Sequence, residues 1–123
     1  MANPNIVAVT SIYGNTSYLI PSTTGATTWT ALTPAVGTVN KINNIVASNV
    51  TGSAVAVTVS INSATGGGGT AYRIAYQISV PANASLIIVD KTTAIYVGES
   101  QSIVVTVGTG SAIELTSSYE AIS

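Results

Sequence analysis

The sequence predicts an all-β fold: one antiparallel β-sandwich of about eight strands, jelly-roll-like in arrangement. Three observations lead to this prediction. Val, Ile and Thr make up 47 of the 123 residues, whereas Leu occurs four times and Phe is absent. Branched Cβ atoms fit a pleated sheet and crowd a helix. Apolar residues recur at every second position, and turn residues interrupt the chain about every ten residues.

The predicted strands follow one another along the whole chain. Residues 53–61, 71–80, 102–107 and 112–120 alternate clearly, so each is expected to bury one face. Weaker strands are expected at residues 5–13, 16–20, around Trp29, and at 39–50, 85–89 and 94–97. Turns are expected at residues 15–16, 21–25, 51–52, 64–69, 81–83, 98–99 and 108–110. The pattern favours a jelly roll without excluding another sandwich topology.

The length corresponds to one domain, residues 1–123, with a short N-terminal arm (residues 1–5) and a C-terminal tail (residues 117–123). The beginning of the sequence lacks the basic and apolar regions of a signal peptide, and no apolar run is long enough to span a membrane. We therefore expect a protein made in a cytoplasm, without a membrane partner.

The composition argues against most chemistry. The chain has no His, no Cys and only seven charged residues, with a net charge of −1. Ser-His-Asp triads, Cys-His pairs and the usual zinc and haem sites are therefore excluded. Three cations are too few to neutralise a nucleic-acid backbone. We expect no enzyme activity, no cofactor, no metal and no nucleic-acid partner.

Three features invite a functional interpretation. The run Gly66–Gly69 lacks the Lys and hydroxyl of a phosphate-binding loop, and a flexible hairpin tip is the better prediction. The carboxylate pairs Glu114 with Glu120 and Asp90 with Glu99 fit solvated surface charges better than an acid/base site. Six Tyr and Trp29 could line a sugar site, but their scatter favours core or interface positions.

Several segments resemble small all-β virion structural proteins of tailed bacteriophages, particularly phages of cyanobacteria and related marine hosts. These segments are MANPNIVAVTSIYGNT, VNKINNIVASNVTGSAVAVTVSI, VPANASLIIV, IYVGESQSIVVTV and ELTSSYEAIS, and together they cover most of the chain. The resemblance implies a non-enzymatic component of a virus particle, located on the outside of the head or at the neck, tail or fibres.

A nearly neutral, apolar chain also suits close packing in many copies, because like-charge repulsion is weak. The main hypothesis is a capsid decoration or cement protein that forms homo-oligomers and binds the major capsid protein or another virion protein. The alternatives are a neck, tail or fibre component, or a host-recognition module that binds glycans through Tyr or Trp29. The expected assembly contacts are Met1, Ala2, Asn3, Pro4, Asn5, Gly66, Gly67, Gly68 and Gly69.

Overall fold

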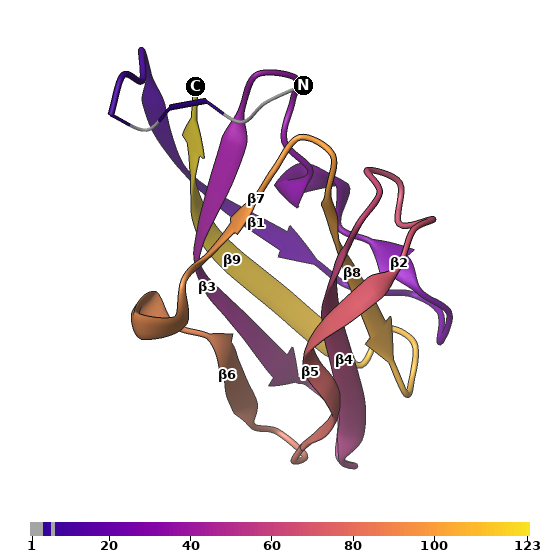
Figure 1. Cartoon of the computed structure of the whole chain (residues 1–123). Helices are drawn as coiled ribbons and strands as arrows, with labels where there is room; N and C mark the ends of the chain where they lie inside the picture. The colour runs from indigo at the N-terminus through magenta and orange to yellow at the C-terminus, as the bar shows by residue number, and fades with distance from the viewer. Residues whose placement is uncertain (1–3, 6) are drawn as a thin grey trace.

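Two antiparallel sheets face each other across an apolar core (Figure 1). The computed structural model describes residues 4, 5 and 7–123. Within them lie nine strands and two 3-10 helices. In chain order these are β1 (Ile12–Leu19), β2 (Thr27–Thr28), η1 (Thr30–Leu32), β3 (Val39–Asn49), β4 (Val55–Asn62), β5 (Ala71–Val80), β6 (Ser85–Val89), η2 (Lys91–Thr93), β7 (Ile95–Val97), β8 (Ser102–Val107) and β9 (Ile113–Ile122).

The strand order is that of a jelly roll. One sheet has the order β1-β9-β3-β6, with β7 also paired to β3, and the other has the order β2-β8-β4-β5. The strands β6 and β7 lie along successive parts of β3 and form one interrupted edge, which gives eight strand positions. The pairs β1·β9, β2·β8, β3·β6/β7 and β4·β5 are nested, as in one long hairpin that has been rolled up. The predicted jelly-roll-like sandwich is confirmed.

The core is built from the alternation seen in the sequence. Val57 and Val59 of β4 face Ile45 of β3 and Leu115 of β9, all at 0–1% exposure. A buried aliphatic side chain of this size contributes roughly 1.5–3 kcal/mol relative to an exposed one. Trp29, next to η1, joins the same cluster at 1% exposure. This burial excludes the hypothesis that Trp29 is an exposed glycan-binding residue.

The predicted C-terminal tail is wrong. Residues 117–122 belong to β9, the strand that lies between β1 and β3 and pairs with both. Ser117 and Ile122 are buried. The predicted tail overlapped the predicted strand at residues 112–120, and the structure agrees with the strand, which continues to Ile122.

Two further expectations are corrected near the sheet edges. The predicted turn at residues 15–16 is absent from the described structure, because β1 runs continuously from Ile12 to Leu19 in register with β9. The strand β5 has the predicted bounds, but Tyr76 and Ile78 on its predicted buried face are exposed. Two register shifts between β4 and β5 break the alternation that the sequence shows.

Candidate functional site

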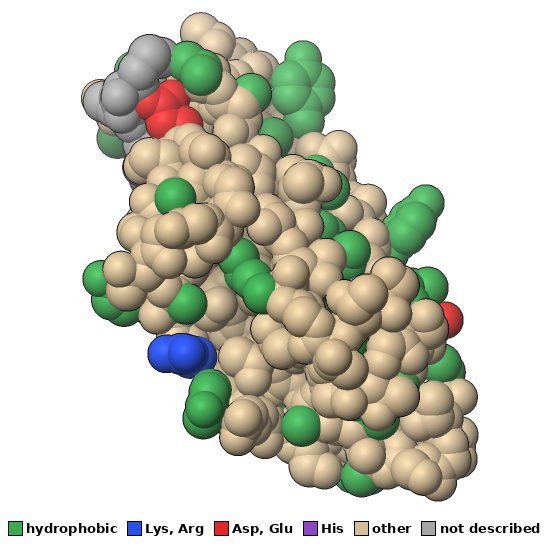
Figure 2. Space-filling view, turned by 90° about the vertical axis from the view of Figure 1, so that its right-hand side faces the viewer, with side chains coloured by type: hydrophobic (Ala, Val, Ile, Leu, Met, Phe, Trp, Pro, Cys, Tyr) green, Lys and Arg blue, Asp and Glu red, His purple; other side chains and the backbone are tan. Residues whose placement is uncertain are grey.

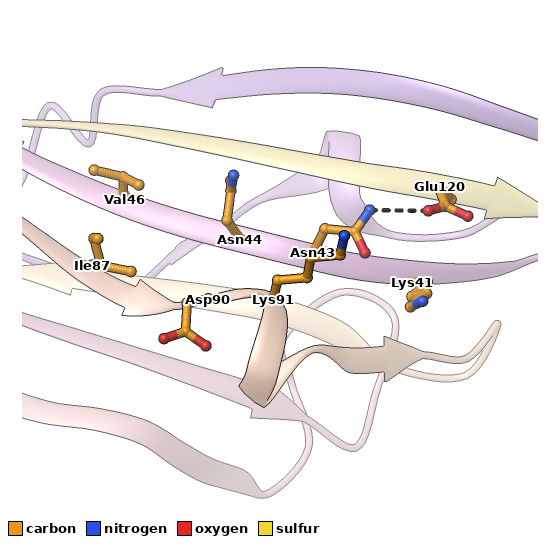
Figure 3. A pocket seen from close by; sticks show the side chains of 8 residues that line it. All are labelled: Lys41, Asn43, Asn44, Val46, Ile87, Asp90, Lys91 and Glu120. Atoms are coloured by element: carbon orange, nitrogen blue, oxygen red, sulfur yellow. Dashed lines mark hydrogen bonds between the residues drawn. The ribbon is translucent and has the colours of Figure 1, made fainter.

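A groove lined by charged, amide and aliphatic side chains lies on the outer face of the sheet that contains β3 and β9 (Figure 3). It has a volume of ≈ 460 Å³. Four of the seven charged residues of the chain line it, two basic and two acidic. The lining residues are Lys41, Asn43, Asn44, Val46, Ile87, Asp90, Lys91 and Glu120.

A β-bulge in β3 places the two asparagines in this groove. The register with β9 passes from Ile42 directly to Asn44, so Asn43 is the extra residue. Ile42 and Ile45 both face the core, which leaves the two asparagines between them on the outer side. Asn44 Oδ1 accepts a hydrogen bond from the Ser118 amide at 2.9 Å.

The two carboxylates of the groove are occupied by structural contacts. Glu120 Oε1 accepts a hydrogen bond of 3.2 Å from Asn43 Nδ2 (Figure 3). Asp90 Oδ1 accepts hydrogen bonds from the amides of Thr92 and Thr93 and from the Thr92 hydroxyl, and so caps η2. The groove therefore offers two lysines and two amide side chains beside aliphatic ones, but its carboxylates do not form an acid/base pair.

Capping lowers the pKa of Asp90 below its ordinary value of 3.8, chiefly through the hydrogen bond from the Thr92 hydroxyl and also through the Thr92 amide. A carboxyl group whose pKa is lower in the folded state than in the unfolded state stabilises the fold at pH values above the unfolded-state pKa. This contribution disappears as the pH falls through the folded-state pKa. We therefore expect Asp90→Asn to be less stable than the wild type at neutral pH, with the difference vanishing in strong acid.

Denaturant midpoints of both proteins between about pH 7 and pH 2 test this prediction. Thr92→Val is the matched variant, because it removes the hydroxyl that contributes most to the lowered pKa and should flatten the dependence. A difference between wild type and Asp90→Asn that stays constant across this range would contradict the assignment.

The remaining acidic pairs also fail to form a site. Glu114 and Glu120 both lie on β9, where Glu114 is exposed and Glu120 contacts Asn43. Glu99 Oε2 accepts a hydrogen bond from the Gly37 amide at 2.6 Å, which lowers the pKa of Glu99. Asp90 instead caps η2, so the two acids have separate structural roles. The described residues contain no group of three side chains suited to a metal ion.

The glycine run lies in the β4–β5 hairpin loop, as predicted, but the loop is not a free tip. Asn62 donates hydrogen bonds to the carbonyls of Gly67 and Gly69 and accepts from the amides of Ala64 and Gly69. Gly67 has a positive φ of 79°, and a Cβ there would lie 3.2 Å from Val104 Cγ2. The loop thus folds back against β8. These contacts correct the prediction of a flexible tip.

Asn62→Ala is expected to release this loop, because it removes the two hydrogen bonds that Asn62 Nδ2 donates and the two that Asn62 Oδ1 accepts. The loss should lower the free energy of unfolding by about 1–3 kcal/mol and remove hydrogen-exchange protection at the Ala64 and Gly69 amides. Asn62→Asp is the control, since it keeps the acceptor oxygen for these two amides. If the two amides are protected as strongly in Asn62→Ala as in the wild type, other contacts hold the loop.

The N-terminal arm is described only in part. Residues 1–3 lie outside the described residues. Pro4 is half-buried and Asn5 is exposed, and Asn5 accepts hydrogen bonds from the amides of Val7 and Ala8. The structure brings neither Pro4 nor Asn5 together with the glycine loop in any hydrogen bond among the described residues.

Sequence reasoning left the tyrosines between core and interface positions, and it missed the edge on which two of the exposed ones lie. Tyr13 and Tyr18 of β1 are 66% and 79% exposed. Tyr72, Tyr76 and Tyr96 are exposed as well, and only Tyr119 packs against the core. The signal available was the excess of Tyr over Phe, because a buried aromatic residue does not need the hydroxyl.

Comparison with known proteins shows the fold and leaves the family open. No family model and no curated protein matches the chain. Among solved structures, a chain from Bacillus endospore appendages, described as a novel family of disulfide-linked pili, is similar. It has a TM-score of 0.50 and 14% identity, over 99% of this chain and 95% of that one. A chain of the infectious bursal disease virus Gt strain matches with a TM-score of 0.42 and 10% identity, over 91% of this chain and 30% of that one. Within the described part of the present chain, no helix is long and apolar enough to cross a membrane.

Proposed function

We propose that this chain is a non-enzymatic structural subunit that functions in a multi-copy assembly, as a decoration protein on the outer surface of a tailed-phage head. The observation that carries the proposal is the character of the surface. Among the described residues, twelve large hydrophobic side chains are exposed, whereas the whole chain has seven charged residues. Figure 2 shows hydrophobic side chains projecting at several places on one face, with few charges among them.

Such a surface suits close contact with neighbours. Weak like-charge repulsion lets copies sit side by side, and exposed apolar side chains gain free energy when a partner covers them. The jelly roll is a fold that viral capsid proteins use. The likeness of several segments to small virion proteins supports the same proposal. The partners of the chain would be further copies of itself and the major capsid protein.

A second candidate is a subunit of a surface filament. The specific observation in its favour is that the fold is shared, over nearly the full length of both chains, with the Bacillus appendage chain. Those pili are described as disulfide-linked, whereas the present chain has no Cys. A filament of this chain would therefore be held together by non-covalent contacts alone.

Quantitative mass spectrometry of purified particles tests the proposal against its alternatives. Many copies in a simple ratio to the major capsid protein support decoration of the head. A small fixed number, set by the symmetry of the tail axis, would replace decoration with a neck, tail or fibre role. Absence from particles and presence in purified cell-surface filaments would favour the second candidate. Absence from both would overturn an assembly function.

A further inference from the structure

The two sheets have four free edges, and three of them are interrupted. The edge strand β2 is two residues long. The edge made by β6 and β7 is broken by η2, which projects outward between them and carries Lys91 (Figure 1). The edge strand β5 has two register shifts, a positive φ of 48° at Gln77 and a charge at Arg73. Short strands, bulges and charges are the devices by which proteins prevent edge-to-edge pairing.

The fourth edge, β1, carries none of these devices. Its eight residues pair with β9 without a register shift, and they include no charge and no Pro. Among the described residues, no strand pairs with its outer side. An open edge of this kind is a template for another strand.

The hydrogen bonds at the start of β1 show which of its backbone groups face outward. Ser11 and Ser123 exchange two hydrogen bonds, each 3.0 Å long, so Ser11 is oriented toward β9. Because amide orientation alternates along an antiparallel ladder, residues 13, 15, 17 and 19 also pair inward. The N–H and C=O groups of Ile12, Gly14, Thr16 and Tyr18 therefore point away from β9.

We propose that the outer edge of β1 pairs with β1 of a second copy of this chain, antiparallel and across a two-fold axis. The inference rests on the proposed assembly function and names the contact that this function would use. An axis at Asn15 places Ile12 opposite Tyr18 and Gly14 opposite Thr16, which gives every outward amide and carbonyl a partner. The Ile12–Tyr18 pair is also a favourable cross-strand combination of an aromatic with a β-branched side chain.

A second copy fits this edge because β1 has no charged residue. It holds none of the seven charged residues, so antiparallel self-pairing places no like charges opposite each other. Exposed side chains at both ends of the strand, Ile12 at 54% and Tyr18 at 79%, would lose water contact in the same step. Pairing would join the two β1-β9-β3 sheets into one sheet across the dimer.

Sedimentation velocity of the full chain over a concentration series, with two pairs of variants, tests this contact. Tyr18→Lys places a charge on the β1 edge, and Tyr72→Lys makes the same change on the interrupted edge strand β5. Thr16→Pro removes an outward N–H without loss of a backbone hydrogen bond to β9. Thr16→Val keeps that N–H and, like Thr16→Pro, lacks the hydroxyl that contacts Ser118 Oγ, so the pair differs in the N–H. We expect Tyr18→Lys and Thr16→Pro to raise the dissociation constant at least about tenfold. Their two controls should match the wild type.

Hydrogen exchange of the same samples identifies the pairing directly. The Ile12, Gly14, Thr16 and Tyr18 amides should become protected only when the chain associates, whereas the inward amides of β1 should be protected in monomer and dimer. Thermal unfolding of each variant shows that a loss of association is not a loss of fold.

Two results would overturn the inference, and they differ in what they mean for the proposed function. If the wild type associates and Tyr18→Lys associates equally well, the β1 contact is wrong and self-assembly stands. If the wild type stays monomeric at every concentration, the β1 contact is again wrong. The copy number in purified particles is then the measurement that decides the assembly function.

Discussion

A chain that ends at Thr116 is expected not to fold. Residues 117–122 pair with residues 12–17 of β1 on one side and with β3 on the other, so their removal breaks two ladders at once. It also removes the buried side chain of Ile122 and exposes the atoms that this side chain covers. The truncated chain should lack the near-UV signal and the cooperative thermal transition of the full chain.

The control for this truncation is a chain that lacks only Ser123. It loses the hydrogen bonds between Ser123 and Ser11 but keeps all of β9, and it should unfold cooperatively. Cooperative unfolding of the chain that ends at Thr116 would show that the end of β9 is dispensable, as the sequence alone suggested.

Trp29→Ala is expected to lower the free energy of unfolding by about 3–5 kcal/mol, as for a large aromatic side chain removed from a core. The indole is 1% exposed and belongs to the core cluster, and its Nε1 donates a hydrogen bond of 3.1 Å to Ser17 Oγ of β1. The cavity would therefore open where Trp29 connects the edge strand β1 to the core. Denaturant unfolding of wild type and variant measures the loss.

Two milder variants separate packing from the hydrogen bond. Ser17→Ala removes the acceptor alone and should cost about 1 kcal/mol. Trp29→Phe keeps an aromatic ring and should fall between Ser17→Ala and Trp29→Ala. A small effect of Trp29→Ala, together with lost affinity for a glycan, would contradict the buried position and revive the sugar-binding hypothesis.

Most strands were predictable because their side chains alternate and Gly, Pro or Asn separate them. The predicted bounds of residues 71–80, 85–89 and 102–107 agree with β5, β6 and β8. Prediction failed where alternation is weak. Gly14-Asn15-Thr16 looked like a turn but lies inside β1, since strand pairing with β9 overrides the local preference for a turn.

The groove could not be predicted, because a bulge forms it. Asn43 and Asn44 are neighbours in sequence, and strict alternation would send their side chains to opposite faces. The extra residue in β3 turns both outward, next to Glu120 of β9 and Lys91 of η2. Lys41, the neighbours Asp90 and Lys91, and Glu120 come from three distant parts of the sequence and meet there only after the jelly roll has closed.

The sequence by itself determined the all-β class, the single sandwich and the absence of His- and Cys-based chemistry, because composition and alternation are local properties of the chain. Only the tertiary structure decided which edges are open, where the charges gather and which aromatic residues are buried. These properties depend on strand order and register, which arise from contacts between residues distant in sequence. A bulge or a free edge exists only relative to a neighbouring strand, so β1 became recognisable as a candidate contact once its neighbours were known.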